Sequence, residues 1–210
     1  MQDQIDKLLY DYNNKITAQN TSETQKLLVF SVGRHNIFAE SQFVGGLADR
    51  LKGLVTAFYL AVMTSRRFVI YWKSPVALEN NLAPHKYDWS FENARKFIYG
   101  HHDLKHFDMI DRSEVIDKTN ARDLEADLFH DDPVIIMNMN SYRIKFVQRW
   151  FEENHAMQAS YNQLFTKAFQ FLFNFIPKAE FQERKERFET AKAGADKMVG
   201  VHLRTGSGNG

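Results

Sequence analysis

The chain has 210 residues, of which 44% are hydrophobic and 25% charged, as is typical of a soluble globular domain. Because 27 basic side chains nearly balance 26 acidic ones, the net charge of +1 predicts neither nucleic-acid nor membrane binding. The absence of cysteine excludes disulfides and thiolate metal sites and fits a reducing compartment. Neither an apolar run of the roughly 18 residues that span a membrane nor a signal peptide is recognisable. We therefore expect no membrane span, and a cytoplasmic location if the chain is complete at its amino terminus.

Residues 1–22 are predicted to form an amphipathic amino-terminal helix, because apolar side chains recur at helical spacing between residues 3 and 18. The polar run 19–25 ends this helix. The short apolar run Leu27–Val32 then predicts a first buried strand.

A strand–helix–strand unit follows. Gly45 and Gly46 open a helix whose apolar face continues for more than four turns, and Phe68–Trp72 reads as the next strand. Such a βαβ crossover implies a parallel sheet. A glycine-opened helix presents free backbone N–H groups to an anion or a sugar, and the alternative is that the two glycines merely allow a tight turn.

The remaining pattern is weaker between Lys73 and Asp132, where a short helix through Ile98 is expected. Pro133–Met137 predicts a central strand that ends in Asn138-Met-Asn140, where Asn138 or Asn140 faces the ligand cleft or the segment forms a simple turn. Helices are predicted over 142–150, 158–176 and 178–195. The predicted organisation is a single Rossmann-like α/β lobe, 1–210, with a parallel sheet and flanking helices. The predicted parts of this lobe are the amino-terminal helix 1–22, a βαβ core 26–140, a helical layer 141–196, and a final strand with a glycine loop 197–210.

The last stretch combines an apolar run, Met198–Val201, with a histidine, an arginine and a glycine loop. In a strand, His202 and Arg204 point to the same side, and arginine offers a planar fork of donors suited to phosphate. Open α/β sheets bind ligands at the carboxyl ends of their strands. The stretch therefore predicts a phosphate-binding strand end, and an ordinary strand with a tail is the alternative.

Three histidines, His101, His102 and His106, have spacing that admits a shared helix face. Only His102 and His106 are four residues apart, and neither a clear third ligand nor a metal-binding spacing accompanies this pair, so we interpret all three as surface residues and predict no metal site.

Two of these stretches together resemble the GDP-fucose-dependent fucosyltransferases, which include α1,2-, α1,6- and protein-O-fucosyltransferases. Gly45-Gly-Leu-Ala-Asp-Arg-Leu-Lys-Gly53 with Ala57–Ile70 is similar to the family's glycine loop, Asn/Asp-Arg-Leu motif and helix, and Ile70–Lys73 fits the next strand. Val199-Gly-Val-His-Leu-Arg-Thr-Gly206 resembles its His-x-Arg motif. The chain departs from the α1,6-type motif at Thr205-Gly-Ser207, where that motif has a second arginine and an aspartate.

The resemblance implies one lobe of a GT-B-type, inverting transferase that moves fucose from GDP-fucose to a hydroxyl of a glycan or protein acceptor, with no cofactor and no obligatory metal. It implies that Arg204 binds the β-phosphate and that His202 shapes the donor pocket. The remaining residues expected at the donor or substrate are Gly45, Gly46, Arg50, Thr205, Gly206 and Asn138. Asp49 is the nearest carboxylate that could accept the proton of the attacking hydroxyl.

In this family the nucleotide-binding lobe largely follows the His-x-Arg motif, so the resemblance covers the first half of a complete enzyme. A carboxyl-terminal lobe is thus an expected partner, and without it the chain is expected to lack useful turnover. Two rival hypotheses remain: a transferase that uses another nucleotide sugar, and a non-enzymatic module that binds carbohydrate or a protein partner.

Overall fold

The computed structural model describes residues 2–19, 25–32, 46–73, 76–100, 104–108, 132–139, 144–176, 183, 186–190 and 192. Two compact units divide the chain, one over Met1–Phe175 and one over Ile176–Gly210. The elements of the first unit are α1 (Gln2–Gln19), β1 (Leu27–Ser31), α2 (Leu47–Met63), β2 (Arg67–Tyr71), the 3-10 helix η1 (Leu78–Asn80), β3 (Leu82–Pro84), α3 (Phe91–Gly100), β4 (Leu104–Asp108), β5 (Val134–Asn138), α5 (Ile144–His155), α6 (Tyr161–Leu172) and β6 (Phe173–Phe175). In the second unit, the described residues between 183 and 192 are helical.

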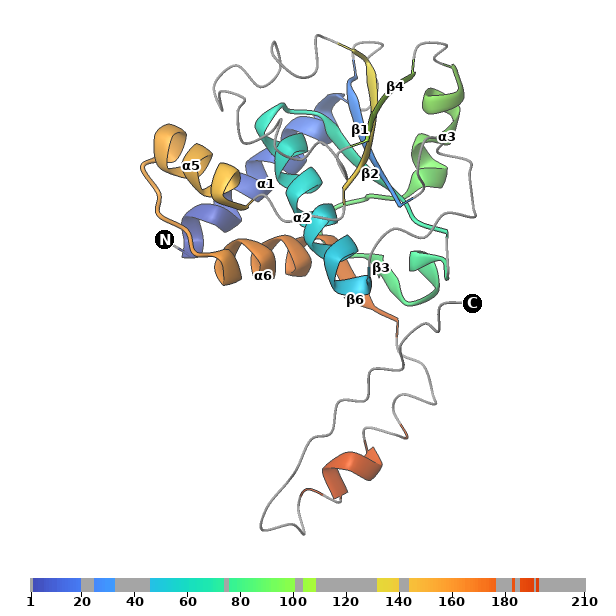
Figure 1. Ribbon diagram of the computed structural model, residues 1–210, viewed down its shortest axis with the longest axis vertical. Helices are drawn as coiled ribbons and strands as arrows, with labels where there is room; N and C mark the ends of the chain where they lie inside the picture. The colour runs from blue at the N-terminus through green and yellow to red at the C-terminus, as the bar shows by residue number, and fades with distance from the viewer. Residues whose placement is uncertain are drawn as a thin grey trace, which may run out of the picture. The chain divides into compact units, whose positions relative to one another are not determined.

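A four-stranded parallel sheet in the order β2-β1-β5-β4 forms the centre of the first unit (Figure 1). The predicted βαβ crossover is confirmed, because β1 and β2 pair in parallel with Leu27 opposite Arg67 and α2 connects them. Strand β5 pairs with the other side of β1, so the strand order reverses at β1. This mixed α/β fold agrees with the predicted Rossmann-like class.

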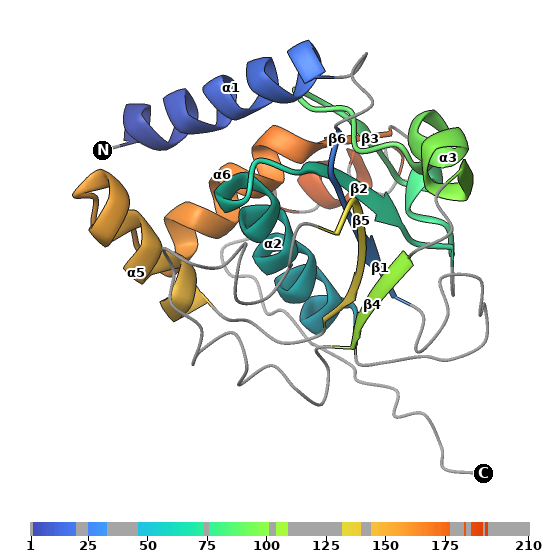
Figure 2. The same cartoon turned by 90° about the horizontal axis from the view of Figure 1, so that it is seen from above.

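Helices cover both faces of this sheet, with α3 on one side and α1, α2, α5 and α6 on the other (Figure 2). The alternation of side chains along the strands explains the two layers. Leu28 and Phe30 of β1 belong to the larger core, whereas Leu27 and Val29 pack in the smaller core under α3. We refer to these as the α2 face and the α3 face.

Strand β2 lies at the edge of the sheet, and two buried tyrosine hydroxyls satisfy its outer backbone. The Phe68 N–H donates to the hydroxyl of Tyr87 at 2.7 Å and to that of Tyr12 at 3.2 Å. Tyr87 donates in turn to the carbonyl of Phe68, and Tyr12 donates to the carbonyl of Arg66 at 2.6 Å. An edge strand otherwise presents unpaired backbone donors and acceptors, and α1 and residues 87–90 cover them along the outer edge of β2.

The carboxyl end of α6 differs from the predicted helix over 158–176, because the helix ends at Leu172 and a short strand follows. Phe173 adopts an extended backbone with φ −124° and ψ 137°, and β6 pairs with β3 in antiparallel. The backbone N–H groups of His85 and Lys86 donate to the carbonyls of Leu172 and Phe171. These bonds satisfy carbonyls that a helix end leaves without intrahelical partners.

Helix α5 ends in a left-handed residue, Ala156, with φ 49°. Its N–H donates to the carbonyl of Glu152, and that of Met157 donates to Phe151. Since non-glycine residues are disfavoured there, Ala156→Gly is expected to raise the free energy of unfolding by about 0.5–1 kcal/mol, measured by urea denaturation. The matched control, Ala48→Gly in the first turn of α2, is expected to lower it by up to about 1 kcal/mol. Equal losses in both variants would contradict this prediction.

Candidate functional site

The amino end of α2 begins at the predicted glycine loop. Gly46 caps the helix with an extended backbone, φ −71° and ψ 169°, and makes no side-chain capping bond. A Cβ built on Gly46 would meet only the carboxylate of Asp49, at 3.9 Å. The backbone therefore does not require glycine here, and the missing side chain leaves the first turn of the helix open to close approach.

Asp49, the predicted proton acceptor, lies in this first turn and has a half-exposed side chain. Its carboxylate pairs with the Lys52 ammonium at 3.2 Å, three residues further along the helix. A carboxylate at this position also interacts favourably with the positive end of the helix dipole. These contacts account for Asp49 as a helix-stabilising residue, and its catalytic role stays a prediction.

Arg50 is the buried cation of the site, with 6% of its surface exposed. Its guanidinium lies 5.7 Å from the ring centroid of Trp72, the residue directly after β2, and Trp72 packs against Phe30 of β1. The helix start is thereby fixed against the carboxyl ends of β1 and β2. A guanidinium over the face of an indole is stabilised by a cation–π interaction.

Burial lowers the pKa of Arg50, because a low-dielectric surrounding disfavours the charged form. The amino end of a helix also carries partial positive charge, which disfavours a cation in the first turn. A bound anion would stabilise the charged Arg50 guanidinium against both its burial and the helix dipole. The carboxyl edge of the sheet beside α2 is thus electrostatically suited to a phosphate.

Asn138, the predicted polar strand end, is the last residue of β5 and is 3% exposed. Met137 pairs with Phe30 on the α2 face, so the next residue, Asn138, points to the α3 face. The fold therefore brings Gly46, Asp49, Arg50 and Asn138 to one edge of the sheet but divides Asn138 from Arg50 by the sheet itself. Gly45, His202, Arg204, Thr205 and Gly206 lie outside the described residues.

Ser31 and Tyr71, the polar residues that end β1 and β2, are not among the predicted site residues. The register pairs them directly, and Ser31 is fully buried. Each ends an apolar run on the α3 side, and this alternation is the signal that could have revealed them.

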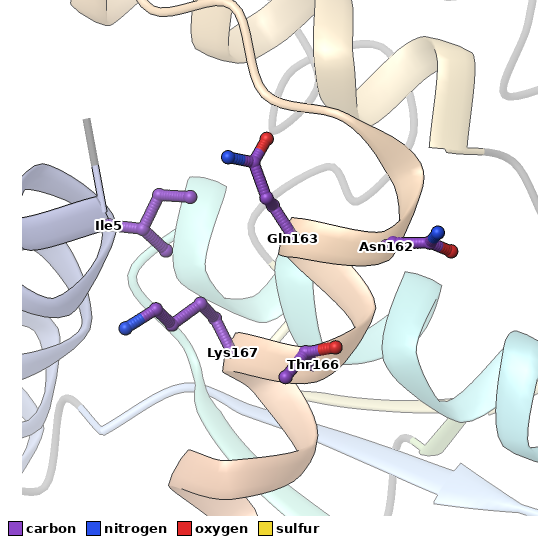
Figure 3. A pocket seen from close by; sticks show the side chains of 5 residues that line it. All are labelled: Ile5, Asn162, Gln163, Thr166 and Lys167. Atoms are coloured by element: carbon purple, nitrogen blue, oxygen red, sulfur yellow. The ribbon is translucent and has the colours of Figure 1, made fainter.

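Cavities also occur between the helices. One, of about 210 Å³, is lined by Ile5 of α1 and by four residues of α6; Figure 3 shows Gln163 and Lys167 on the side of α6 that is nearer to Ile5, whereas Asn162 and Thr166 point away from it. Lys167 at this cavity pairs with Asp6. A second cavity, of about 580 Å³, is lined by residues of α5 and α6 and of the loop between them, including Gln148 and Ser160. Neither cavity is lined by a residue of the predicted site.

Over the described part of the chain, no group of three or more histidine, aspartate or glutamate side chains is arranged to hold a metal ion. His106 is exposed on β4, and His101 and His102 lie outside that part. The helices within the same residues include none with the length and apolar character needed to cross a bilayer.

No protein-family model matches the chain, and no curated protein sequence matches it.

Proposed function

We propose that the chain is the amino-terminal, Rossmann-like lobe of an inverting glycosyltransferase that uses a nucleotide sugar, GDP-fucose by the resemblance described above. The observation that carries the proposal is the buried Arg50 guanidinium in the open first turn of α2, at the carboxyl edge of a parallel sheet. Ligands of open α/β sheets bind at this edge, beside the strand where the order reverses. A nucleotide diphosphate supplies the negative charge that suits this position.

The proposed reaction forms a bond between an acceptor oxygen and the anomeric carbon of the sugar while the bond from that carbon to the diphosphate breaks. The hydroxyl proton passes to a carboxylate, for which Asp49 is the candidate, and the nucleotide diphosphate leaves with both bonding electrons. Negative charge grows on the leaving group, so fixed cations stabilise the transition state more than the bound substrate. Arg204 is proposed for this role and Arg50 for holding the donor.

The decisive test is donor binding, measured by isothermal titration of GDP-fucose and UDP-glucose into the 210-residue chain. Arg50→Met keeps an unbranched side chain against Trp72 but removes the charge. It is expected to weaken GDP-fucose binding by about 10-fold to 100-fold, because hydrogen bonds to charged groups contribute about 1.5–3 kcal/mol. Arg204→Ala is expected to cause a comparable loss.

Lys52→Met is the matched control, since Lys52 is a cation in the same region of α2 whose side chain is 39% exposed and pairs with Asp49. Its affinity for GDP-fucose should stay within about twofold, because exposed ion pairs contribute little. Equal affinities of Arg50→Met and the unsubstituted chain, with thermal unfolding unchanged, would refute the donor site at α2. Tighter binding of UDP-glucose than of GDP-fucose would instead favour another nucleotide sugar.

A further inference from the structure

A row of polar residues crosses the sheet at its carboxyl edge. The register pairs Tyr71 of β2 with Ser31 of β1, and it pairs Asn138 of β5 with Asp108 of β4. Ser31 and Asn138 each follow the pair Phe30–Met137 by one residue, so they are neighbours across β1 and β5. One polar residue from each of the four strands therefore stands at the same level of the sheet.

The side chains of Tyr71, Ser31 and Asn138 share the α3 face, because neighbours in register on parallel strands point the same way. The preceding residues of β1 and β5 on that face, Val29 and Ile136, are apolar and packed in the core under α3. Tyr71 packs beside the same core, with its ring 4.6 Å from that of Phe91. The α3 face thus changes from apolar to polar at its last row.

Asn138 differs from the other residues of this row because its side chain carries a buried polar atom that has no partner among the described residues. It is 3% exposed, and its side-chain Oδ1 is buried with no hydrogen-bond partner among the residues that the structure describes. A buried acceptor without a partner is unfavourable, and native proteins contain few of them. A leucine would continue the apolar pattern of Val134 and Ile136 without this penalty, so the amide is better explained by a ligand than by folding.

We propose that Asn138 Oδ1 accepts a hydrogen bond from a hydroxyl group of the saccharide acceptor, with the Ser31 and Tyr71 hydroxyls lining the same row. An amide oxygen repels anions and binds neutral O–H donors, which matches a sugar and not a phosphate. The diphosphate is assigned to Arg50 on the α2 face, so the sugar of the donor would extend over the carboxyl edge of the sheet to meet the acceptor hydroxyl. This inference rests on the proposed function for the identity of the acceptor as a saccharide.

The test compares Asn138→Leu with Asn174→Leu, the same substitution at an exposed residue of β6. Methyl glycosides of glucose, galactose and N-acetylglucosamine are the probes, detected by saturation-transfer NMR and titrated against the full chain with GDP present. Asn138→Leu should weaken binding of the preferred glycoside at least about 10-fold, from the loss of a hydrogen bond and its desolvated partner. Its melting temperature should rise by about 2–4 °C, as expected for removing a buried unpaired acceptor from a chain of this length. Asn174→Leu should change glycoside affinity by less than twofold.

Asn138→Ala serves as a second variant, because it removes the oxygen without adding bulk, and it should lose glycoside binding equally. The proposal is overturned if no glycoside binds, if both Asn138 variants keep their affinity, or if Asn138→Leu melts below the unsubstituted chain. GDP-fucose affinity should be unchanged in both Asn138 variants. If Arg50→Met keeps its GDP-fucose affinity while Asn138→Leu loses glycoside binding, the donor site at Arg50 is refuted and the acceptor site at Asn138 is supported.

Discussion

Trp89→Ala is expected to lower the free energy of unfolding by about 3–5 kcal/mol, the range for removing a fully buried large aromatic side chain. Trp89 is completely buried, and its indole N–H donates to the carbonyl of Leu172 at 2.7 Å. Its ring packs edge-on against Phe173, with 5.5 Å between ring centroids, and its own carbonyl accepts from the Ile70 N–H. One residue therefore joins the outer side of β2 to the end of α6.

The decrease expected for Trp89→Ala is a large share of the total free energy of unfolding of a native domain, which is roughly 5–15 kcal/mol. Urea denaturation followed by far-ultraviolet circular dichroism measures it without depending on the deleted fluorophore. Trp89→Phe keeps most of the packing and removes one of two donors to the Leu172 carbonyl, which still accepts from the His85 N–H, so it should lose less, about 0.5–1.5 kcal/mol. Tyr10→Ala, at a residue that is 63% exposed, should stay within about 0.5 kcal/mol. A Trp89→Ala loss no greater than that of Tyr10→Ala would show that this junction contributes little.

Alkaline pH is expected to destabilise the first unit through Tyr12 and Tyr87. Burial raises the pKa of Tyr87 to about 12, and burial together with the neighbouring Tyr87 raises the pKa of Tyr12 well above its ordinary value of 10. The two hydroxyls lie 3.3 Å apart, and both bond to the backbone around Phe68. The folded state therefore favours the protonated, neutral form of both tyrosines.

Because the pKa values of Tyr12 and Tyr87 are raised in the folded state, the unfolded chain loses these protons at a lower pH than the folded chain does. Below pH 10 both states keep the tyrosine protons, so this contribution to stability is fully present. Between pH 10 and about 12 the unfolded chain ionises while folded Tyr87 does not, so the free energy of unfolding falls as pH rises. The expected slope is about 1.4 kcal/mol per pH unit for each tyrosine.

Urea denaturation at pH 8, 10 and 11 measures this dependence. Tyr87→Phe should be less stable at pH 8, because the Phe68 carbonyl loses its hydroxyl donor. It should also show a shallower decline above pH 10, since one of the two shifted groups is gone. Tyr10→Phe, at an exposed tyrosine, should keep both the stability and the slope. Parallel declines in Tyr87→Phe and the unsubstituted chain would contradict the assignment to this tyrosine pair.

The parts of the fold that sequence periodicity predicted are the ones whose pattern is local. Helix α2 begins directly after Gly46 and keeps one apolar face. The apolar runs of β1, β2 and β5 are continuous because helices cover both faces of the parallel sheet. Strand β4 was missed because Leu104-Lys-His-Phe-Asp108 is polar at several positions, as an edge strand allows. The three-residue strands β3 and β6 exist through their mutual pairing, which no local pattern records.

For the candidate site, the sequence patterns predicted the residue types but not the face of the sheet on which each residue lies. The motif resemblance indicated Gly46 and Arg50, yet the burial of Arg50 depends on Trp72, twenty-two positions later in the chain. Asn138 was predicted at a strand end. Its neighbours Ser31 and Tyr71 become visible only when the register of three strands is known. The role of Arg204 and His202 stays a prediction.

The tyrosine contacts along β2 have a consequence for how chains of this protein meet one another. A second polypeptide that approached this strand would find the Phe68 amide and carbonyl already engaged by Tyr12 and Tyr87, and the Ile70 amide engaged by Trp89. Strand addition at β2 is therefore blocked by the Tyr12 side chain from α1 and, in the segment before α3, by the Tyr87 side chain and the Trp89 backbone carbonyl. The amino-terminal helix accordingly protects this edge as well as packing on the core, and a form without it would lose the Tyr12 bonds to Arg66 and Phe68 but keep those of Tyr87 and Trp89.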